Sequence, residues 1–185
     1  MKKVTFLFLI GMFITAVSFT SCKKVVDDLQ DSIEVTLHTD LAVPMDIVPT
    51  AGKGNTGEFN SQATLDPTQN AELADYLEKI KRIEVEKIKV LVTRVSVADL
   101  IMRTGTFTLT DNETGDSFTF HTPENFAIAV GTTYEIDNTT EGWATLNQIV
   151  TSLHAVTVTA VGTINNDNYD IGADIILPVK AVAKP

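Results

Sequence analysis

Alternation of apolar and polar residues, repeated over many short runs, is the feature that most constrains the fold of this 185-residue chain. In the run 33–38, IEVTLH, every second residue is apolar. The same period of two returns in 106–110 and 117–121, on either side of the turn-forming segment 111–116, DNETGD. Because successive side chains of a strand point to opposite faces, this period predicts half-buried strands joined by hairpins.

We predict strands over residues 33–47, 83–97, 106–110, 117–121, 126–130, 133–137, 156–162 and 171–182. Pro44 interrupts the first of these, which an edge strand tolerates. A change of register at Glu86-Lys87 predicts a bulge or bend in the second. Strands of this number, joined by short turns such as 165–168, NNDN, predict an all-β fold, an antiparallel β-sandwich of the Ig-like type.

Two segments have helical periodicity, and we predict two accessory amphipathic helices that pack on the sandwich. The first spans residues 67–81, with Asp66 as N-cap, Pro67 as first helical residue and Gln69 completing a variant of the capping box. The second has Thr139 or Thr140 as its expected cap. Their apolar stripes are Leu73, Tyr76, Leu77 and Ile80 in the first, and Trp143, Leu146, Ile149, Val150 and Leu153 in the second.

The first 22 residues, MKKVTFLFLIGMFITAVSFTSC, indicate where the chain is delivered. Lys2 and Lys3 precede an apolar run of about 16 residues, which is typical of a secretory signal peptide and marginal for crossing a membrane. Thr20-Ser21-Cys22 at its end resembles the lipobox of bacterial lipoproteins. The resemblance implies cleavage before Cys22 and attachment of acyl chains such as palmitate to this cysteine, and two or three such chains anchor a protein stably. An uncleaved anchor helix is the alternative.

This resemblance divides the chain into a lipoprotein signal peptide (1–21), a lipidated tether (22–32) and a β-sandwich domain (33–185). The tether is polar and has no sustained periodicity. Its Asp27-Asp28 resembles the acidic residues that follow the acylated cysteine in Bacteroidota surface lipoproteins. Asp31-Ser32-Ile33 resembles the short O-glycosylation sequon of that phylum, so Ser32 is a possible glycosylation site, the alternative being an ordinary lead-in to a strand.

Charge and cysteine content exclude several classes of function. Cleavage before Cys22 removes two of the 14 basic residues and none of the 24 acidic ones, so the net charge becomes −12. A surface this acidic repels nucleic acid and anionic lipid headgroups, and we expect no nucleic-acid partner. Cys22 is the only cysteine, and acylation would leave it no free thiol, so we expect no disulfide, zinc–thiolate site or cysteine nucleophile. We expect no cofactor and no bound metal.

Three patterns suggest chemistry, and each has an ordinary structural interpretation. Gly52–Gly57, GKGNTG, matches the dinucleotide-binding pattern G-x-G-x-x-G, but no helical stripe follows it, which favours a glycine-rich loop. The acids of 111–116 offer oxygens to calcium, but their spacing favours a hairpin turn. Trp143 is a possible ligand contact that stacks on sugars, although its place on the apolar stripe favours the core.

Function follows from location and architecture, because no residue pattern identifies an enzyme. His38, His121 and His154 are scattered, and no Gly-x-Ser-x-Gly elbow accompanies them. We expect a non-catalytic lipoprotein, exported and lipid-anchored to the bacterial cell envelope at the outer membrane, that binds an envelope protein or a glycan. The alternatives are a fimbrial or structural assembly subunit, which would use strand addition, and a small hydrolase. With its helix 68–81 leading into the strand 83–97, the chain resembles small β-sandwich lipoproteins of Bacteroidota, a likeness that implies no activity.

Overall fold

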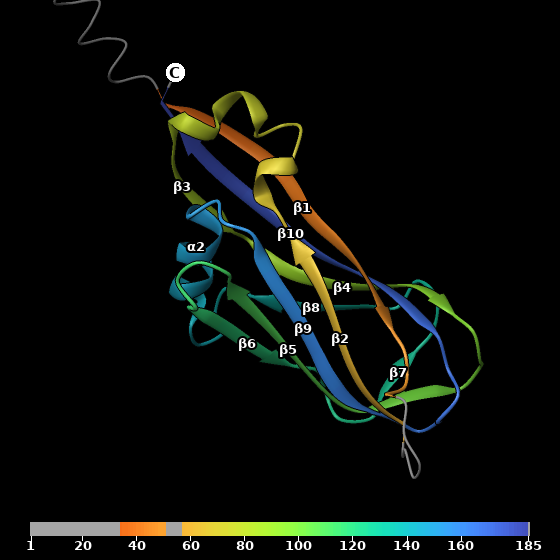
Figure 1. The fold of residues 1–185 in the computed structure, drawn as a ribbon. Helices are drawn as coiled ribbons and strands as arrows, with labels where there is room; N and C mark the ends of the chain where they lie inside the picture. The colour runs from red at the N-terminus through yellow and green to blue at the C-terminus, as the bar shows by residue number, and fades with distance from the viewer. Residues whose placement is uncertain (1–33, 51–56, 185) are drawn as a thin grey trace, which may run out of the picture. The chain divides into compact units, whose positions relative to one another are not determined.

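Ten β-strands make up most of the computed structural model, which describes residues 34–50 and 57–184 (Figure 1). Their bounds are β1 Val35–Ile47, β2 Glu58–Leu65, β3 Ile80–Val85, β4 Lys87–Val95, β5 Leu100–Asp111, β6 Ser117–His121, β7 Phe126–Ile128, β8 Thr133–Asp137, β9 Val156–Ile164 and β10 Ile171–Ala183. One α-helix, α2 (Trp143–Thr151), and two 3₁₀ helices, η1 (Pro67–Gln69) and η2 (Ala74–Lys79), complete this part of the chain. Residues 36–183 form one compact unit.

The strands form two antiparallel sheets. The order in one is β1-β10-β4-β8, with β3 also pairing β10, and in the other β2-β9-β5-β6, with β7 also pairing β5. The pairing is nested along the chain, since β1 pairs with β10, β2 with β9, β4 with β8 and β5 with β6. The predicted all-β antiparallel sandwich is confirmed. Its nested strand order is that of a jelly roll and not of the Ig-like type that was expected.

The core lies between the two sheets and is built from the inward-facing half of each alternating run. In β5 and β6, Phe107, Leu109, Phe118 and Phe120 are all buried, as the hairpin pattern predicts. The rings of Phe107 and Phe120 stack with centroids 5.1 Å apart. Each such side chain removed from water contributes about 1.5–3 kcal/mol, so the alternation that defines the strands also stabilises the sandwich.

The long strand predicted over 83–97 is interrupted where the register changes. It divides into β3 and β4, which both pair with β10, and Glu86 lies between them. The amide of Glu86 still donates to the carbonyl of Pro178 in β10, at 2.9 Å. β3 and β4 therefore follow β10 as one bent strand, which confirms the predicted bend.

The helix predicted over 67–81 is wrong in its extent and type. Asp66 caps the segment as predicted, because its carboxylate accepts the amide of Thr68 at 2.9 Å. The turn ends at Asn70, whose side-chain oxygen accepts the amides of Glu72 and Leu73. Those amides would otherwise continue an α-helix, so the local side-chain bonds leave two short 3₁₀ helices.

Helix α2 covers the free edge of β3. Trp143, Asn147 and Thr151 are four residues apart and therefore share one face of the helix. The indole nitrogen of Trp143 donates to the carbonyl of Val85 at 2.9 Å, and the side-chain oxygen of Asn147 accepts the amide of Val85 at 2.8 Å. The hydroxyl of Thr151 accepts the amide of Ile83 at 2.8 Å and donates to its carbonyl at 3.1 Å. These three side chains thus hydrogen-bond the free backbone N–H and C=O groups of the β3 edge, which would otherwise be available to pair with another strand.

The start of α2 differs from the sequence prediction. Its N-cap is Gly142, which has φ 83°, and no side chain caps the helix. Thr139 lies before the helix and is hydrogen-bonded to the carboxylate of Asp137, while the Thr140 amide donates to the Asp137 carbonyl. The threonines predicted as caps therefore belong to the preceding turn.

Strand β2 has no counterpart among the predicted strands. Phe59 and Leu65 are buried, but the inward positions between them hold the small residues Ser61 and Ala63, which weaken the apolar alternation. Gly57 precedes β2, so a strand and not a helix follows the G-x-G-x-x-G pattern, as the loop interpretation requires. The rest of that pattern lies outside the described residues.

Candidate functional site

Trp143 lies in the core and not on a ligand-binding surface. Its side chain is 7% exposed, and its ring meets Phe118 edge-on with centroids 5.7 Å apart. The indole nitrogen is occupied by the carbonyl of Val85. Of the two interpretations of Trp143, the packing therefore favours the core residue, since neither a ring face nor a donor is left for a sugar.

A polar cluster ties the β5–β6 turn to the end of α2. Asp111 is buried, and its Oδ1 accepts the amides of Glu113 at 2.8 Å and Thr114 at 3.1 Å. Its Oδ2 accepts the hydroxyl of Ser152 at 2.9 Å and lies 3.0 Å from Nδ1 of His154. Nε2 of His154 lies 3.1 Å from a carboxylate oxygen of Glu113. The acids proposed as calcium ligands thus build the turn, as the hairpin interpretation predicts.

The electrostatics of this cluster favour an ionised Asp111. Burial alone would raise the pKa of the Asp111 carboxyl, but hydrogen bonds from Thr114, Glu113, Ser152 and His154 outweigh it and hold that pKa well below its usual range. The cluster contains a serine, a histidine and an aspartate, yet it is not arranged as a nucleophile and base. The Ser152 hydroxyl has two acceptors within hydrogen-bond distance, Asp111 and the Ile149 carbonyl, while both ring nitrogens of His154 face carboxylates.

An acidic groove of about 590 Å³ lies beside β1. Asp40, Glu72 and Glu86 line it together with His38, whose Nδ1 is 3.5 Å from Glu86. Asn70 lies in the same groove, and its amide nitrogen donates to the Asp40 carbonyl at 3.1 Å. The groove is open, and His38 with Glu86 and Thr39 with Asn70 form side-chain pairs in it, so it shows no built ligand site.

The outer face of the β2-β9-β5-β6 sheet is the most distinctive surface of the described chain. We call it the hydroxyl face, because threonine dominates the outward positions of its strands. Cross-strand neighbours place these side chains in successive rows: Thr64, Thr157, Thr110 and Ser117; Gln62, Thr159, Thr108 and Thr119; Asn60, Val161, Thr106 and His121; Glu58, Thr163 and Thr104. All of them are exposed or half-buried, so no other described segment covers this face.

Hydrogen bonds between neighbouring strands fix several of these hydroxyls. The hydroxyl oxygens of Thr108 and Thr119 are 3.0 Å apart, and those of Thr104 and Thr163 are 2.9 Å apart. Thr106 is 3.0 Å from Nδ1 of His121. Since a hydroxyl donates one hydrogen bond and accepts two, each paired hydroxyl keeps capacity for a further partner.

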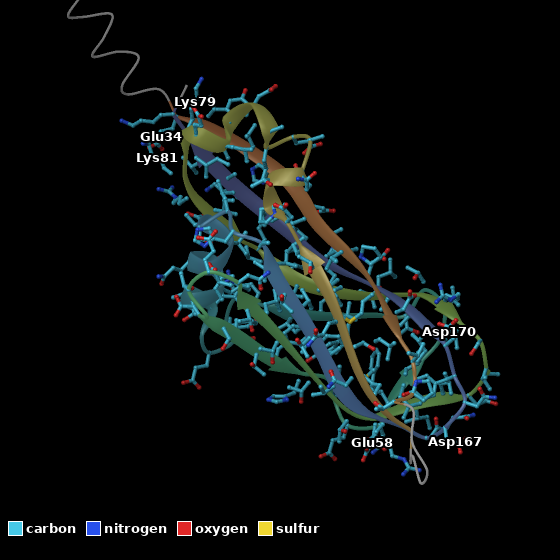
Figure 2. All side chains as sticks on the ribbon, in the orientation of Figure 1. Glu34, Glu58, Lys79, Lys81, Asp167 and Asp170 are labelled. Carbon is cyan, nitrogen blue, oxygen red and sulfur yellow. The ribbon has the colours of Figure 1, made fainter. Side chains whose placement is uncertain are left out.

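The other sheet presents a charged outer surface. Lys87 of β4 pairs with Glu135 of β8 at 3.1 Å. On β3 and β10, Glu84 lies between Arg82 and Lys180. The hydroxyl face, in contrast, has one acidic side chain, Glu58, which lies at the same end of the molecule as Asp167 and Asp170, while Lys79 and Lys81 lie at the opposite end (Figure 2).

The hydroxyl face was not predicted as a site, although the sequence carries its signal. Threonine occupies 106, 108 and 110 in one predicted strand, and 157 and 159 in another. Alternation shows that these positions share the outward face of each strand. It does not show that the two strands are neighbours, which β5 and β9 become through the nested pairing.

Neither the anchor nor a metal site can be located in the structure. Cys22, Ser32, the signal segment 1–21 and the tether 22–32 lie outside the described residues. Within residues 34–50 and 57–184, no helix is long and apolar enough to span a membrane. The same residues contain no group of three or more histidine, cysteine, aspartate or glutamate side chains placed to hold a metal ion.

Comparison with known proteins identifies neither a family nor a function for the chain. No protein-family model and no curated protein sequence matches the chain. Among solved structures, the decameric BFDV capsid protein is similar over 80% of this chain and 99% of its own, with 11% identity and a TM-score of 0.44. The capsid of Macrobrachium rosenbergii nodavirus, as a semi-empty virus-like particle, is similar over 83% of this chain and 96% of its own, with 7% identity and a TM-score of 0.37. At these values the likeness supports no inference about what the chain binds.

Proposed function

We propose that this chain is a lipid-anchored protein of the bacterial cell envelope whose non-catalytic β-sandwich binds a protein or glycan partner through the hydroxyl face. The signal segment and Thr20-Ser21-Cys22 support the anchor, which would hold the chain on the outer membrane through acyl chains on Cys22. The sandwich would then present its surfaces to other envelope components.

One observation carries the binding role: a broad surface with few charged side chains on a strongly acidic protein. The chain has a formal net charge of −10, and charge spread over a surface keeps proteins soluble and apart. Across four neighbouring strands, however, the hydroxyl face replaces charged residues with threonine, serine, asparagine and glutamine. Such a surface permits close approach by a partner without the cost of removing ions from water.

Strand addition, on which the assembly alternative depends, has obstacles at two edges. Pro44 lies in the edge strand β1 and lacks an amide hydrogen, and the side chain of Asn70 occupies the Asp40 carbonyl of the same strand. The edge of β3 is covered by α2. These features favour binding through a sheet face over assembly through those edges.

The anchor is tested by replacing the cysteine. Cys22→Ala should release the protein from membranes of the cells that produce it, measured by fractionation and immunoblotting. Ser21→Ala, which leaves the cysteine in place, is the matched control and should stay with the membrane. Retention of Cys22→Ala on membranes would show that the apolar segment anchors the chain uncleaved.

The binding role is tested by capture from intact cells. Cross-linked complexes of the wild-type protein should contain an envelope component that is lost from Thr108→Lys/Thr159→Lys, because two ammonium groups on the hydroxyl face must be desolvated by any close partner. Thr93→Lys/Thr133→Lys places the same charges on exposed positions of the other sheet. Identical capture by all three proteins would refute binding through the hydroxyl face.

A further inference from the structure

The chemistry of the hydroxyl face narrows the class of partner. Most of its outward groups are hydroxyls and amides, which both donate and accept hydrogen bonds. A partner that matches them must offer many uncharged donors and acceptors over an extended length. We propose, on the basis of the binding role above, that the hydroxyl face binds a neutral polysaccharide whose chain lies across the rows of threonines.

The charge of the face argues for a neutral polymer. A cationic partner would gain more from the acidic groove lined by Asp40, Glu72 and Glu86 than from the hydroxyl face, whose one carboxylate is Glu58. An anionic partner would find no lysine or arginine in the rows of the face, and only Arg103, exposed in β5 beside Thr104, at their end. Charge complementarity thus favours an uncharged partner.

The side chains also argue against a folded protein as the partner. Protein interfaces derive most of their binding energy from tryptophan, tyrosine and arginine, whereas serine, threonine and valine are under-represented at their hot spots. The rows of the hydroxyl face contain none of those anchors, and Arg103 adjoins them only at the end, beside Thr104. Within its rows the exposed apolar side chain is Val161, which is 38% exposed and lies between Asn60 and Thr106, where it can contact the C–H groups of a sugar ring. Ile101, 37% exposed, lies beyond the rows at the start of β5.

The regular spacing of the face suits a repeating ligand. Neighbouring strands lie about 4.8 Å apart, and outward residues along one strand lie about 6.7 Å apart. The row of Thr159, Thr108 and Thr119 therefore repeats one chemical group at a fixed interval, with the pair Thr108–Thr119 held at 3.0 Å. A polymer of identical units can occupy such a row in many registers, and anchored copies side by side would add avidity.

Affinity electrophoresis tests the proposal with the full chain in mild detergent. The probes are dextran, mannan and laminarin as neutral polysaccharides, and alginate as an anionic one. At least one neutral probe should retard the protein, and alginate should not. Thr108→Val/Thr119→Val/Thr159→Val, which keeps the β-branched shape and removes one row of hydroxyls, should raise the apparent Kd at least about tenfold.

The matched control is Thr36→Val/Thr93→Val/Thr133→Val, which makes the same change at exposed threonines in strands of the other sheet and should bind like wild type. If the first variant does not fold, Thr119→Lys at an exposed position replaces it, with the same expected loss. Three results would overturn the glycan proposal: no neutral probe retards the protein, or both triple variants bind equally weakly. The third is that the wild-type protein self-associates and that the first triple variant alone abolishes this association. None of these results affects the membrane anchor, which the Cys22→Ala fractionation tests separately.

Discussion

The charge of Asp111 should contribute measurably to stability, because four donors converge on one buried carboxylate. Its Oδ1 accepts the amides of Glu113 and Thr114, and its Oδ2 accepts Ser152 and lies beside His154. Asp111→Asn keeps the shape of the side chain and an oxygen for the two amides. It removes the charge and presents an amide nitrogen to Ser152 and His154 instead.

The size of the effect follows from which bonds each variant loses. A hydrogen bond to a charged group contributes about 1.5–3 kcal/mol, so Asp111→Asn should lower the free energy of unfolding by about 2 kcal/mol at neutral pH. Asp111→Ala loses the acceptor for all four donors and the contact between turn and helix end. Its cost should be about 4 kcal/mol, in the range for breaking a buried charged pair.

The difference in the free energy of unfolding between wild type and Asp111→Asn should depend on pH, and the direction of that dependence follows from the pKa of Asp111. The hydrogen bonds to Asp111 lower the pKa of its carboxyl in the folded protein. A lowered folded-state pKa means that the extra stability is fully present above the ordinary aspartate pKa of about 3.9 and is lost as pH falls below it. The difference in the free energy of unfolding between the two proteins should therefore become smaller as the pH falls from about 4 to about 2.

Urea unfolding followed by circular dichroism, at a series of pH values, measures these differences through the midpoint and slope. Glu113→Gln is a useful control, since its carboxylate is 70% exposed and its loss should cost less than about 1 kcal/mol. If Asp111→Asn matches wild type at pH 7, or if the gap widens on acidification, the hydrogen bonds to this carboxylate do not stabilise the fold as reasoned.

Two further predictions concern the edges and interior of the sheets. Asn147→Ala removes the acceptor of the Val85 amide and should cost about 1–3 kcal/mol by urea unfolding. Gln148→Ala, at the exposed neighbouring position, should change stability by less than about 0.5 kcal/mol. Gly162→Ala would place a methyl group against the Thr104 carbonyl oxygen and the Phe59 ring, so its melting temperature should fall by an amount equivalent to about 1–3 kcal/mol. Gly115→Ala, where a methyl group meets no atom within 4 Å, should carry only the smaller cost of its positive φ. Equal losses at Gly162 and Gly115 would show that backbone conformation and not crowding decides the outcome.

The sequence predicted those parts of the fold that depend on local alternation. The hairpin of β5 and β6 was correct because Phe107, Leu109, Phe118 and Phe120 alternate without interruption around a turn of Asn, Asp and Gly. Strand β2 was missed because Ser61 and Ala63 fill inward positions that a larger apolar residue would have marked. Alternation therefore identifies a strand only where its inward positions hold large apolar side chains.

The helix over 67–81 shows the limit of an apolar stripe as evidence. Leu73 and Ile80 have helical spacing, but Asn70 captures the amides that would continue the helix, and Ile80 is needed as a strand partner of Ala183. The Asn70 bonds are local, but the pairing of Ile80 depends on a partner more than a hundred residues away, which local sequence does not reveal. The hydroxyl face was missed for the same reason, because it exists only once β9 lies between β2 and β5.

The nested pairing of the strands also sets the order in which partners become available during synthesis. β1 is the first strand to be made and its partner β10 is the last, whereas β5 and β6 are joined by a short turn and find each other locally. Closing the outermost pair fixes the ends of nearly the whole domain, and folding rates fall as contacts become more distant in sequence. β1, the strand that follows the proposed lipid site, is therefore the strand whose sheet partner is synthesised longest after it.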